Sequence, residues 1–232
     1  MTESPQEILS APSKPGQLNE LPGANQRGEF IRLLPKLRDL AGIGNPIVVC
    51  MTSSIKGEGT TTVAAQFAVA VAGSGSGDRV ILIDGNQEHP EIHELLGLQM
   101  SPGLTEVCNH GLPMDQAVQS TELSTLDVLT VGRHESKGPS FLNSLRFQEI
   151  VSQLEQKYDV VIIDCPPLSS GHGTTQLSKK DAMTALIIEA SQTKREVIEG
   201  ALHELELMGA NVVGVVLNRR QFFVPSFVYR RL

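Results

Sequence analysis

A chain of 232 residues with 40% hydrophobic side chains is long enough to bury a full core, and we expect one α/β domain. Its formal net charge of -7 argues against a nucleic-acid binder, which would present a basic face. The three cysteines lack CxxC spacing and no apolar run is long enough to cross a bilayer, which together favour a cytoplasmic protein with reduced thiols.

The first segment of the chain, residues 1–28, mixes proline and glycine with polar residues. Such a segment cannot bury enough surface to offset its chain entropy, so we expect a flexible arm followed by a domain over residues 29–232. That domain opens with EFIRLLPKLRDL, where apolar residues recur at helical spacing. Pro35 interrupts this pattern and predicts a short or bent helix.

Short apolar, β-branched runs then alternate with helical segments. The runs are Pro46–Met51, Arg79–Asp84, Leu126–Val131, Asp159–Asp164, Ala185–Ala190 and Asn211–Asn218. Nearly continuous Val/Ile runs indicate strands buried on both faces of a mainly parallel sheet, with helices covering it.

The helices between these strands are also visible in the sequence. The segments Thr61–Ala72 and Phe147–Lys157 have helical patterns, and a last helix ends near Gly209. Thr193 followed by Glu196 predicts a capping box at the start of that last helix. The predicted fold class is α/β, a single three-layer α/β/α sandwich.

The stretch SSIKGEGTTT, Ser53–Thr62, joins a strand to a helix, as a phosphate-binding P-loop does. Its glycines allow the backbone to curl around an anion, so that N–H groups and the positive helix end face it. The hydroxyl of Thr61 stands where Mg²⁺ would be ligated, and Thr62 is suited to an α-phosphate. Thr60 replaces the usual lysine, so we expect hydrolysis to suffer more than nucleotide binding.

Two aspartates end strands of the predicted sheet, Asp84 after RVILI and Asp164 after DVVII. Open parallel sheets place their ligands at the carboxyl ends of the strands. Together with the glycine loop at a third strand end, the two carboxylates predict a Mg²⁺–phosphate site.

The order of SSIKGEGTTT, VILIDGNQEHPEIH, SPGLTEV, YDVVIIDCPP and GVVLNRR resembles the bacterial tyrosine kinases (BY-kinases) of capsule and exopolysaccharide synthesis, from about residue 29 onward. These kinases belong with the deviant Walker ATPases that include the Min and Par proteins, which implies a P-loop NTPase-like sheet. The resemblance implies a cytoplasmic domain that binds ATP with Mg²⁺ and phosphorylates its own C-terminal tyrosines. It also implies a membrane chain-length or export protein as partner, which would place the domain at the inner face of the membrane.

The same resemblance implies roles for particular residues. Asp84 and Asp164, with Thr61, would hold Mg²⁺, and the two aspartates would be catalytic. The residues that would contact ATP or ADP are Ser54, Gly57, Glu58, Gly59, Thr60, Thr61, Thr62 and Asn218.

Several departures from the family pattern fall at catalytic positions. Thr60 replaces the Walker A lysine, and Asn86 stands where the second Walker A′ aspartate is expected. Glu88 and His89 replace paired arginines, and the Asp-Ala that follows Walker B is absent from LSSGHGTTQ. These changes predict a lapsed or altered active site, and they leave open whether nucleotide binds.

The tyrosines also indicate an altered function. The chain has only Tyr158 and Tyr229 and therefore lacks the C-terminal tyrosine cluster of the family. We expect a pseudokinase that regulates or scaffolds polysaccharide polymerisation and export. The enzyme that it resembles is a non-specific protein-tyrosine kinase.

Lys56 supports an alternative, an active ATPase or tyrosine autokinase. In the Min and Par relatives a lysine at this offset reaches across a dimer interface to the neighbour's phosphates, so Lys56 could replace the missing charge. The competing interpretation is a solvated loop lysine. A Par-like positioning ATPase shares Lys56 but lacks support from the other motifs.

Self-association is a further expectation from the resemblance. Family members build a ring with Glu, Arg and Arg at three-residue spacing. Glu29 and Arg32 fit that arrangement here, while Pro35 occupies the third place.

Overall fold

The computed structural model describes residues 27–133, 141–171 and 182–219. The expected flexible arm lies outside these ranges, apart from residues 27 and 28, which begin the first helix. Tyr229 and the part of LSSGHGTTQ after Gly171 also lie outside the described residues.

A mainly parallel sheet forms the centre of the described fold. Its strands are β1 (Ile47–Ser53), β2 (Val80–Asp84), β3 (Val118–Ser120), β4 (Leu126–Leu129), β5 (Val160–Asp164), β6 (Met183–Glu189) and β7 (Asn211–Asn218). They lie in the order β3-β4-β2-β5-β1-β6-β7, and only β3 pairs in the antiparallel direction. The six predicted strands are confirmed, whereas β3 is too short to leave a period in the sequence.

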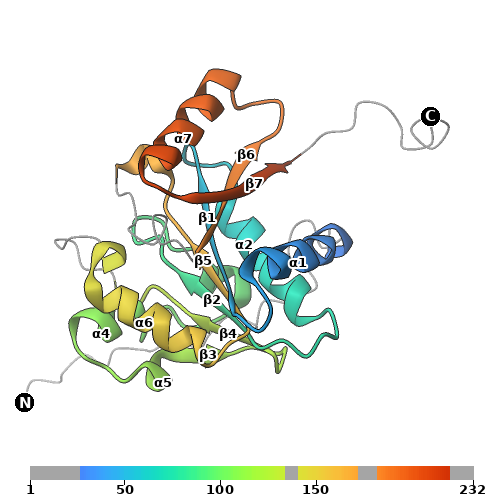
Figure 1. Cartoon of the computed structure of the whole chain (residues 1–232). Helices are drawn as coiled ribbons and strands as arrows, with labels where there is room; N and C mark the ends of the chain where they lie inside the picture. Colours follow the sequence, from blue (N-terminus) through green and yellow to red (C-terminus); the bar gives the residue numbers. More distant parts are fainter. Residues whose placement is uncertain (1–26, 134–140, 172–181, 220–232) are drawn as a thin grey trace, which may run out of the picture.

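Helices cover both faces of this sheet (Figure 1). The α-helices are α1 (Arg27–Ala41), α2 (Thr60–Ala72), α3 (Ile92–Leu96), α4 (Leu104–Asn109), α5 (Met114–Ala117), α6 (Leu145–Glu155) and α7 (Arg195–Leu207). Short 3₁₀ turns cover Phe141–Asn143 and Leu168–Ser170. Helices α1 and α2 pack on one face, and α4, α6 and α7 pack on the other. The predicted three-layer sandwich is confirmed.

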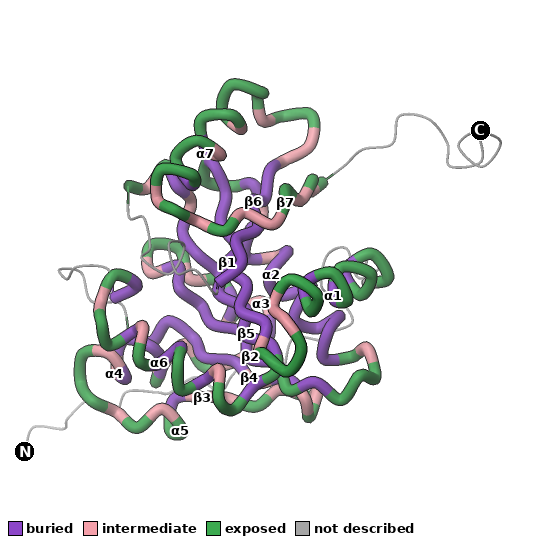
Figure 2. Tube along the Cα trace, in the orientation of Figure 1, coloured by how far each residue is buried: buried purple, intermediate pink, exposed green. Residues whose placement is uncertain are grey.

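The core consists of two apolar layers, one on each face of the sheet. Alternate residues of β1 enter different layers, since Val49 packs with α2 and Val48 packs with α6. Helix α2 is almost entirely buried (Figure 2), because its small Ala and Val side chains allow it to lie between the sheet and α1. Helix α2 is therefore fixed in the core between the sheet and α1.

The predicted first helix is present but it is not short, because α1 continues through Pro35 for 15 residues. Pro35 is exposed, while Phe30, Leu34 and Leu37 are buried, and the Phe30 ring packs edge-on against Phe67 at 5.9 Å. Burial of each such side chain contributes about 1.5–3 kcal/mol, which offsets the roughly 3 kcal/mol that an internal proline costs.

Two further expectations about the C-terminal part are wrong. Strand β7 is not buried on both faces, because it lies at the sheet edge with β6 as its neighbour and exposes Val215 and Leu217. The capping box is also absent. Helix α7 begins at Arg195 after Lys194, without a side-chain cap, and the Thr193 hydroxyl instead donates a hydrogen bond to the Glu58 carboxylate.

Candidate functional site

The candidate site lies where the carboxyl ends of β1, β2 and β5 meet. Asp84 and Asp164 are register partners at the ends of β2 and β5, and Met51 of β1 pairs with Asp164 from the other side. The loop from Ser54 to Gly59 leaves β1 at this edge and leads into α2. The sheet therefore brings the glycine loop and both carboxylates together, as the sequence predicts.

Backbone geometry shapes this loop for an anion. Gly57 and Gly59 adopt positive φ angles of 95° and 86°, which favour glycine. A Cβ at Gly59 would lie 2.3 Å from Asn218 Nδ2, so no other residue fits there without displacement. Helix α2 has neither a side-chain cap nor an acidic residue in its first turn. The backbone N–H groups of that turn can therefore donate hydrogen bonds to an anionic ligand.

Glu58 supports the loop from inside the protein. Only 2% of this residue is exposed, and its carboxylate accepts hydrogen bonds from Ser54 Oγ at 2.7 Å and the Ile55 amide at 3.0 Å. Thr193 Oγ1 and the Glu189 amide bond its other oxygen. Burial opposes ionisation, but these hydrogen bonds, that from Thr193 above all, lower the pKa of Glu58 below its ordinary value. The Glu58 side chain therefore anchors the loop and faces away from the cavity.

The end of β7 braces the same loop. Asn218 Nδ2 donates to the Glu58 carbonyl at 2.9 Å. Arg219 Nη1 donates to the Gly57 carbonyl and to Glu189 Oε2, both at 3.0 Å. The predicted contact of Asn218 with a nucleotide stays a prediction, and its side chain also accepts a hydrogen bond from the Arg219 amide at 2.9 Å. Arg219 was missed, although its position directly after Asn218 in GVVLNRR was a usable signal.

A cavity of about 190 Å³ lies in front of the loop. It is lined by Ser53, Lys56, Gly57, Gly59, Thr60, Thr61, Thr62, Asn86, His89, Glu91, Cys165, Pro167 and Arg219. Most of the predicted loop residues thus face one space, whereas Ser54, Glu58 and Asn218 support it from behind. Among the described residues that line the cavity, only Lys56 and Arg219 carry a permanent positive charge.

Lys56 is engaged with a neighbouring side chain. Its Nζ atom lies 2.7 Å from Nε2 of His89, the residue that stands where the family has an arginine. Thr60 begins α2 and is 9% exposed, so its short side chain brings no charge to the place of the Walker lysine.

Both aspartates are fully buried behind the cavity. Burial first, and then the charge of Glu91, raises the pKa of Asp84 to about 7, although the Asn86 and Ile92 amides donate to its oxygens. Burial and the neighbouring Asp84 raise the pKa of Asp164 well above its usual range, and the Thr61 hydroxyl opposes this rise.

This pair fits a cation. Neither Asp164 oxygen has a hydrogen-bond partner of normal geometry among the described residues, so the carboxylate lacks a compensating group. Two carboxylates beside the Thr61 hydroxyl are oxygen donors of the kind that Mg²⁺ prefers. The described residues contain no group of three or more His, Cys, Asp or Glu side chains that could hold a metal by themselves, so phosphate and water would complete such a site.

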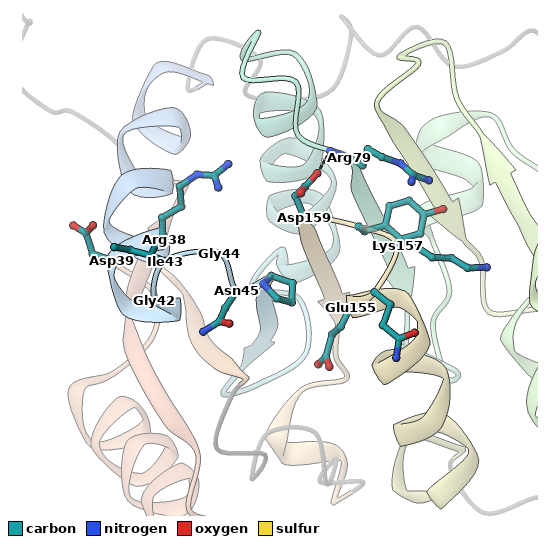
Figure 3. Close-up of a pocket in the computed structure, with 13 residues that line it drawn as sticks. Arg38, Asp39, Gly42, Ile43, Gly44, Asn45, Arg79, Glu155, Lys157 and Asp159 are labelled. Carbon is teal, nitrogen blue, oxygen red and sulfur yellow. Dashed lines mark hydrogen bonds between the residues drawn. The ribbon is translucent and has the colours of Figure 1, made fainter.

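A second cavity, of about 850 Å³, opens at the opposite end of the sheet (Figure 3). Several of its charged residues pair with groups of the protein. Arg38 forms an ion pair with Asp78, the Arg79 amide donates to Asp159 at 2.8 Å, and the Arg79 guanidinium lies 5.0 Å from the Tyr158 ring centre. Since this cavity is lined by neither the glycine loop nor the strand ends that carry Asp84 and Asp164, we place the candidate site at the glycine loop.

Comparisons with known proteins identify the family of this chain. A family model described as AAA domain matches residues 47–208. The tyrosine-protein kinase YwqD of Bacillus subtilis is 31% identical over 173 residues, which cover 75% of this chain and 72% of YwqD. Some other relatives are longer, and the match spans only 20% of the tyrosine-protein kinase ptk of Acinetobacter johnsonii, at 29% identity over 62% of this chain.

Solved structures show the same fold. The chimerical protein CapA2B2 has a TM-score of 0.76 at 26% identity, over 88% of this chain and 89% of its own. The septum site-determining protein MinD of Pyrococcus horikoshii, solved with Mg-ADP, has a TM-score of 0.60 at 20% identity, over 80% of this chain and 76% of its own. Among the described helices, none has the length and apolar character needed to span a bilayer. The matched domain, the likeness to YwqD and the shared fold show that the chain belongs to the bacterial tyrosine-kinase (BY-kinase) family of P-loop ATPases.

Proposed function

We infer that this protein is a pseudokinase of a capsule or exopolysaccharide system that regulates or scaffolds a membrane chain-length or export protein. The observation that carries the proposal is the charge arrangement of the loop cavity. Thr60 stands at the first position of α2, and the lysine that the loop does carry, Lys56, contacts His89. A phosphoryl-transfer site relies on fixed positive charge around the transferred group, and this site lacks it at the central position.

Nucleotide binding is a separate part of the proposal. The loop glycines and the α2 amides would hold the phosphates of ATP or ADP, and Asp84, Asp164 and Thr61 would hold Mg²⁺. When bound, Mg²⁺ would neutralise phosphate charge. MinD of Pyrococcus horikoshii, which shares the fold, was solved with Mg-ADP, and this supports the assignment of the site.

Assembly and localisation follow from the family. We propose that the domain lies at the inner face of the membrane through its partner, and that it does not bind nucleic acid. Glu29 and Arg32 are both exposed on α1, together with Pro35, so this face is available for self-association.

The alternative function is an active ATPase or tyrosine autokinase that uses Lys56. It is favoured by one observation, that Lys56 lines the same cavity as Thr61 and Thr62. In that case turnover would depend on Lys56, and the Lys56→Ala variant would lose it.

Measurements of ATP turnover and phosphotyrosine labelling of the wild-type chain distinguish a pseudokinase from an active ATPase or autokinase. We expect neither above background, and we expect Thr60→Lys to bind ADP with Mg²⁺ about 10- to 100-fold more tightly, since a charge-assisted hydrogen bond contributes about 1.5–3 kcal/mol. Gln153→Lys, which adds the same charge on the exposed face of α6, is the matched control. Brisk turnover by the wild type would overturn the pseudokinase assignment, and its loss in Lys56→Ala would support the alternative.

A further inference from the structure

We propose that Arg219, at the end of β7, supplies the phosphate-binding cation of this site in place of the missing Walker lysine. The inference rests on the proposed function in one respect, that a nucleotide or another phosphate compound occupies the loop. Arg219 lines the same cavity as the loop glycines and the first turn of α2. The ligand class is a di- or triphosphate.

The structure holds Arg219 in a defined position against the loop. Its backbone has a positive φ of 54°, unusual for a residue with a side chain, and its amide donates to Asn218 Oδ1 at 2.9 Å. The guanidinium Nη1 bonds the carbonyl of Gly57 at 3.0 Å. The side chain is therefore already directed along the loop and needs little ordering on binding.

Part of the guanidinium remains available for an anion. Among the described residues, its hydrogen-bond partners are the Gly57 carbonyl and Glu189, and both are reached by Nη1. Nε and Nη2 have no acceptor there. A planar group that presents two further N–H directions matches the geometry of phosphate oxygens.

The ion pair with Glu189 leaves the Arg219 guanidinium able to bind an anion. The pair is partly exposed, with 55% of the Arg219 side chain and 27% of the Glu189 side chain accessible. Ion pairs of this exposure stabilise proteins only slightly, so a multiply charged phosphate can compete for the guanidinium. Lys56, by contrast, already contacts His89 and is a point charge without a fork.

A competing interpretation is that Arg219 only braces the loop through Gly57 and Glu189. The two interpretations differ in what happens when Glu189 loses its charge. If Arg219 binds phosphate, Glu189→Gln frees the guanidinium and strengthens phosphate binding. If Arg219 is only a brace, the same change loosens the loop and weakens binding or leaves it unaltered.

Isothermal titration of the full chain with pyrophosphate, and with ADP in the absence of metal, tests the inference. We expect Arg219→Gln to weaken pyrophosphate binding about tenfold or more, and Arg219→Lys to weaken it less, because the charge stays while the fork is lost. We expect Glu189→Gln to strengthen binding about threefold. The double variant Arg219→Gln/Glu189→Gln should lose that gain. Arg146→Gln, which removes an arginine from an ion pair with Glu149 on α6, should bind as the wild type does.

Three results would overturn the inference: equal affinity in the wild type and Arg219→Gln, weaker binding in Glu189→Gln, or no pyrophosphate binding by the wild type. Should Arg219→Gln fail to fold, as judged by its thermal melt, the Glu189→Gln and Arg219→Lys titrations decide the question. Absent pyrophosphate binding by the wild type would also count against the nucleotide binding proposed above, whereas the comparisons among the Arg219 and Glu189 variants bear on this inference alone. ATP turnover by the wild type would contradict the pseudokinase assignment and would leave the inferred role of Arg219 unaffected.

Discussion

At the scale of single residues, Glu58 shows how the protein itself holds the shape of the loop. Walker-type loops are usually described by the residues that touch the nucleotide, and by position Glu58 is one of them. Here its carboxylate is buried and bonded by Ser54, Ile55, Glu189 and Thr193. The loop is thereby tied to the end of β6 and to Thr193, two residues before α7. A charge-assisted network of this kind is expected to be costly to disturb.

Glu58→Gln should be less stable than the wild type by about 1–3 kcal/mol near neutral pH, because an amide satisfies these four donors poorly. The folded pKa of Glu58 lies below its ordinary value of 4.5, so its stabilisation is complete above about pH 5 and is lost as pH falls through the folded pKa. The gap between the two proteins should therefore narrow in acid. Urea unfolding at a series of pH values measures it, with exposed Glu204→Gln as the control. A gap that widens in acid would contradict the assignment.

At the scale of elements, α1 shows packing overriding propensity. Pro35 lacks an amide hydrogen for the carbonyl of Ile31, and the pyrrolidine ring crowds that turn. The helix persists because its opposite side, with Phe30 and Leu34, is part of the core over α2. Sequence reading weighs the proline locally and cannot see this tertiary contact.

Pro35→Ala should accordingly stabilise the protein by about 2 kcal/mol. The substitution restores a helical hydrogen bond worth up to about 3 kcal/mol relative to proline, less about 1 kcal/mol for the freer unfolded chain. Denaturant unfolding of the variant, with its neighbour Lys36→Ala as the control, measures the difference. A loss of stability would mean that the proline ring makes a contact of its own.

At the scale of the whole molecule, the sheet places two carboxylates side by side away from water. Their burial and mutual repulsion disfavour the fold, and a cation would relieve both effects. Buried like charges that lower the stability of the fold are typical of residues that bind a ligand.

Asp164→Asn should be more stable than the wild type by about 0.5–2 kcal/mol when metals are removed with EDTA. The amide is uncharged and can donate a hydrogen bond to the adjacent Asp84. Thermal unfolding with and without EDTA measures the effect, and Asp115→Asn, at an exposed site on α5, should match the wild type. If Asp164→Asn unfolds at a lower temperature in EDTA, the carboxylate pair is not a source of strain.

The sequence is sufficient to predict the layers, the six long strands and the meeting of the glycine loop with Asp84 and Asp164, because all of these depend on residue periodicity and on strand ends. It is not sufficient for features set by contacts between distant segments. The pairing of Glu58 with Thr193, 135 positions apart, and the contact of Arg219 with Gly57 arise only when β6 is placed beside β1 and β7 beside β6. Thr193 was mistaken for a helix cap for the same reason.

The bracing of the loop by Glu58 and Asn218 has a consequence for the history of such proteins. Since Glu58 and Asn218 hold the curvature of the loop from the protein side, replacement of a side chain in the first turn of α2 would leave that curvature in place. A protein built in this way could lose ATP turnover by one substitution and still present the same surface to a binding partner.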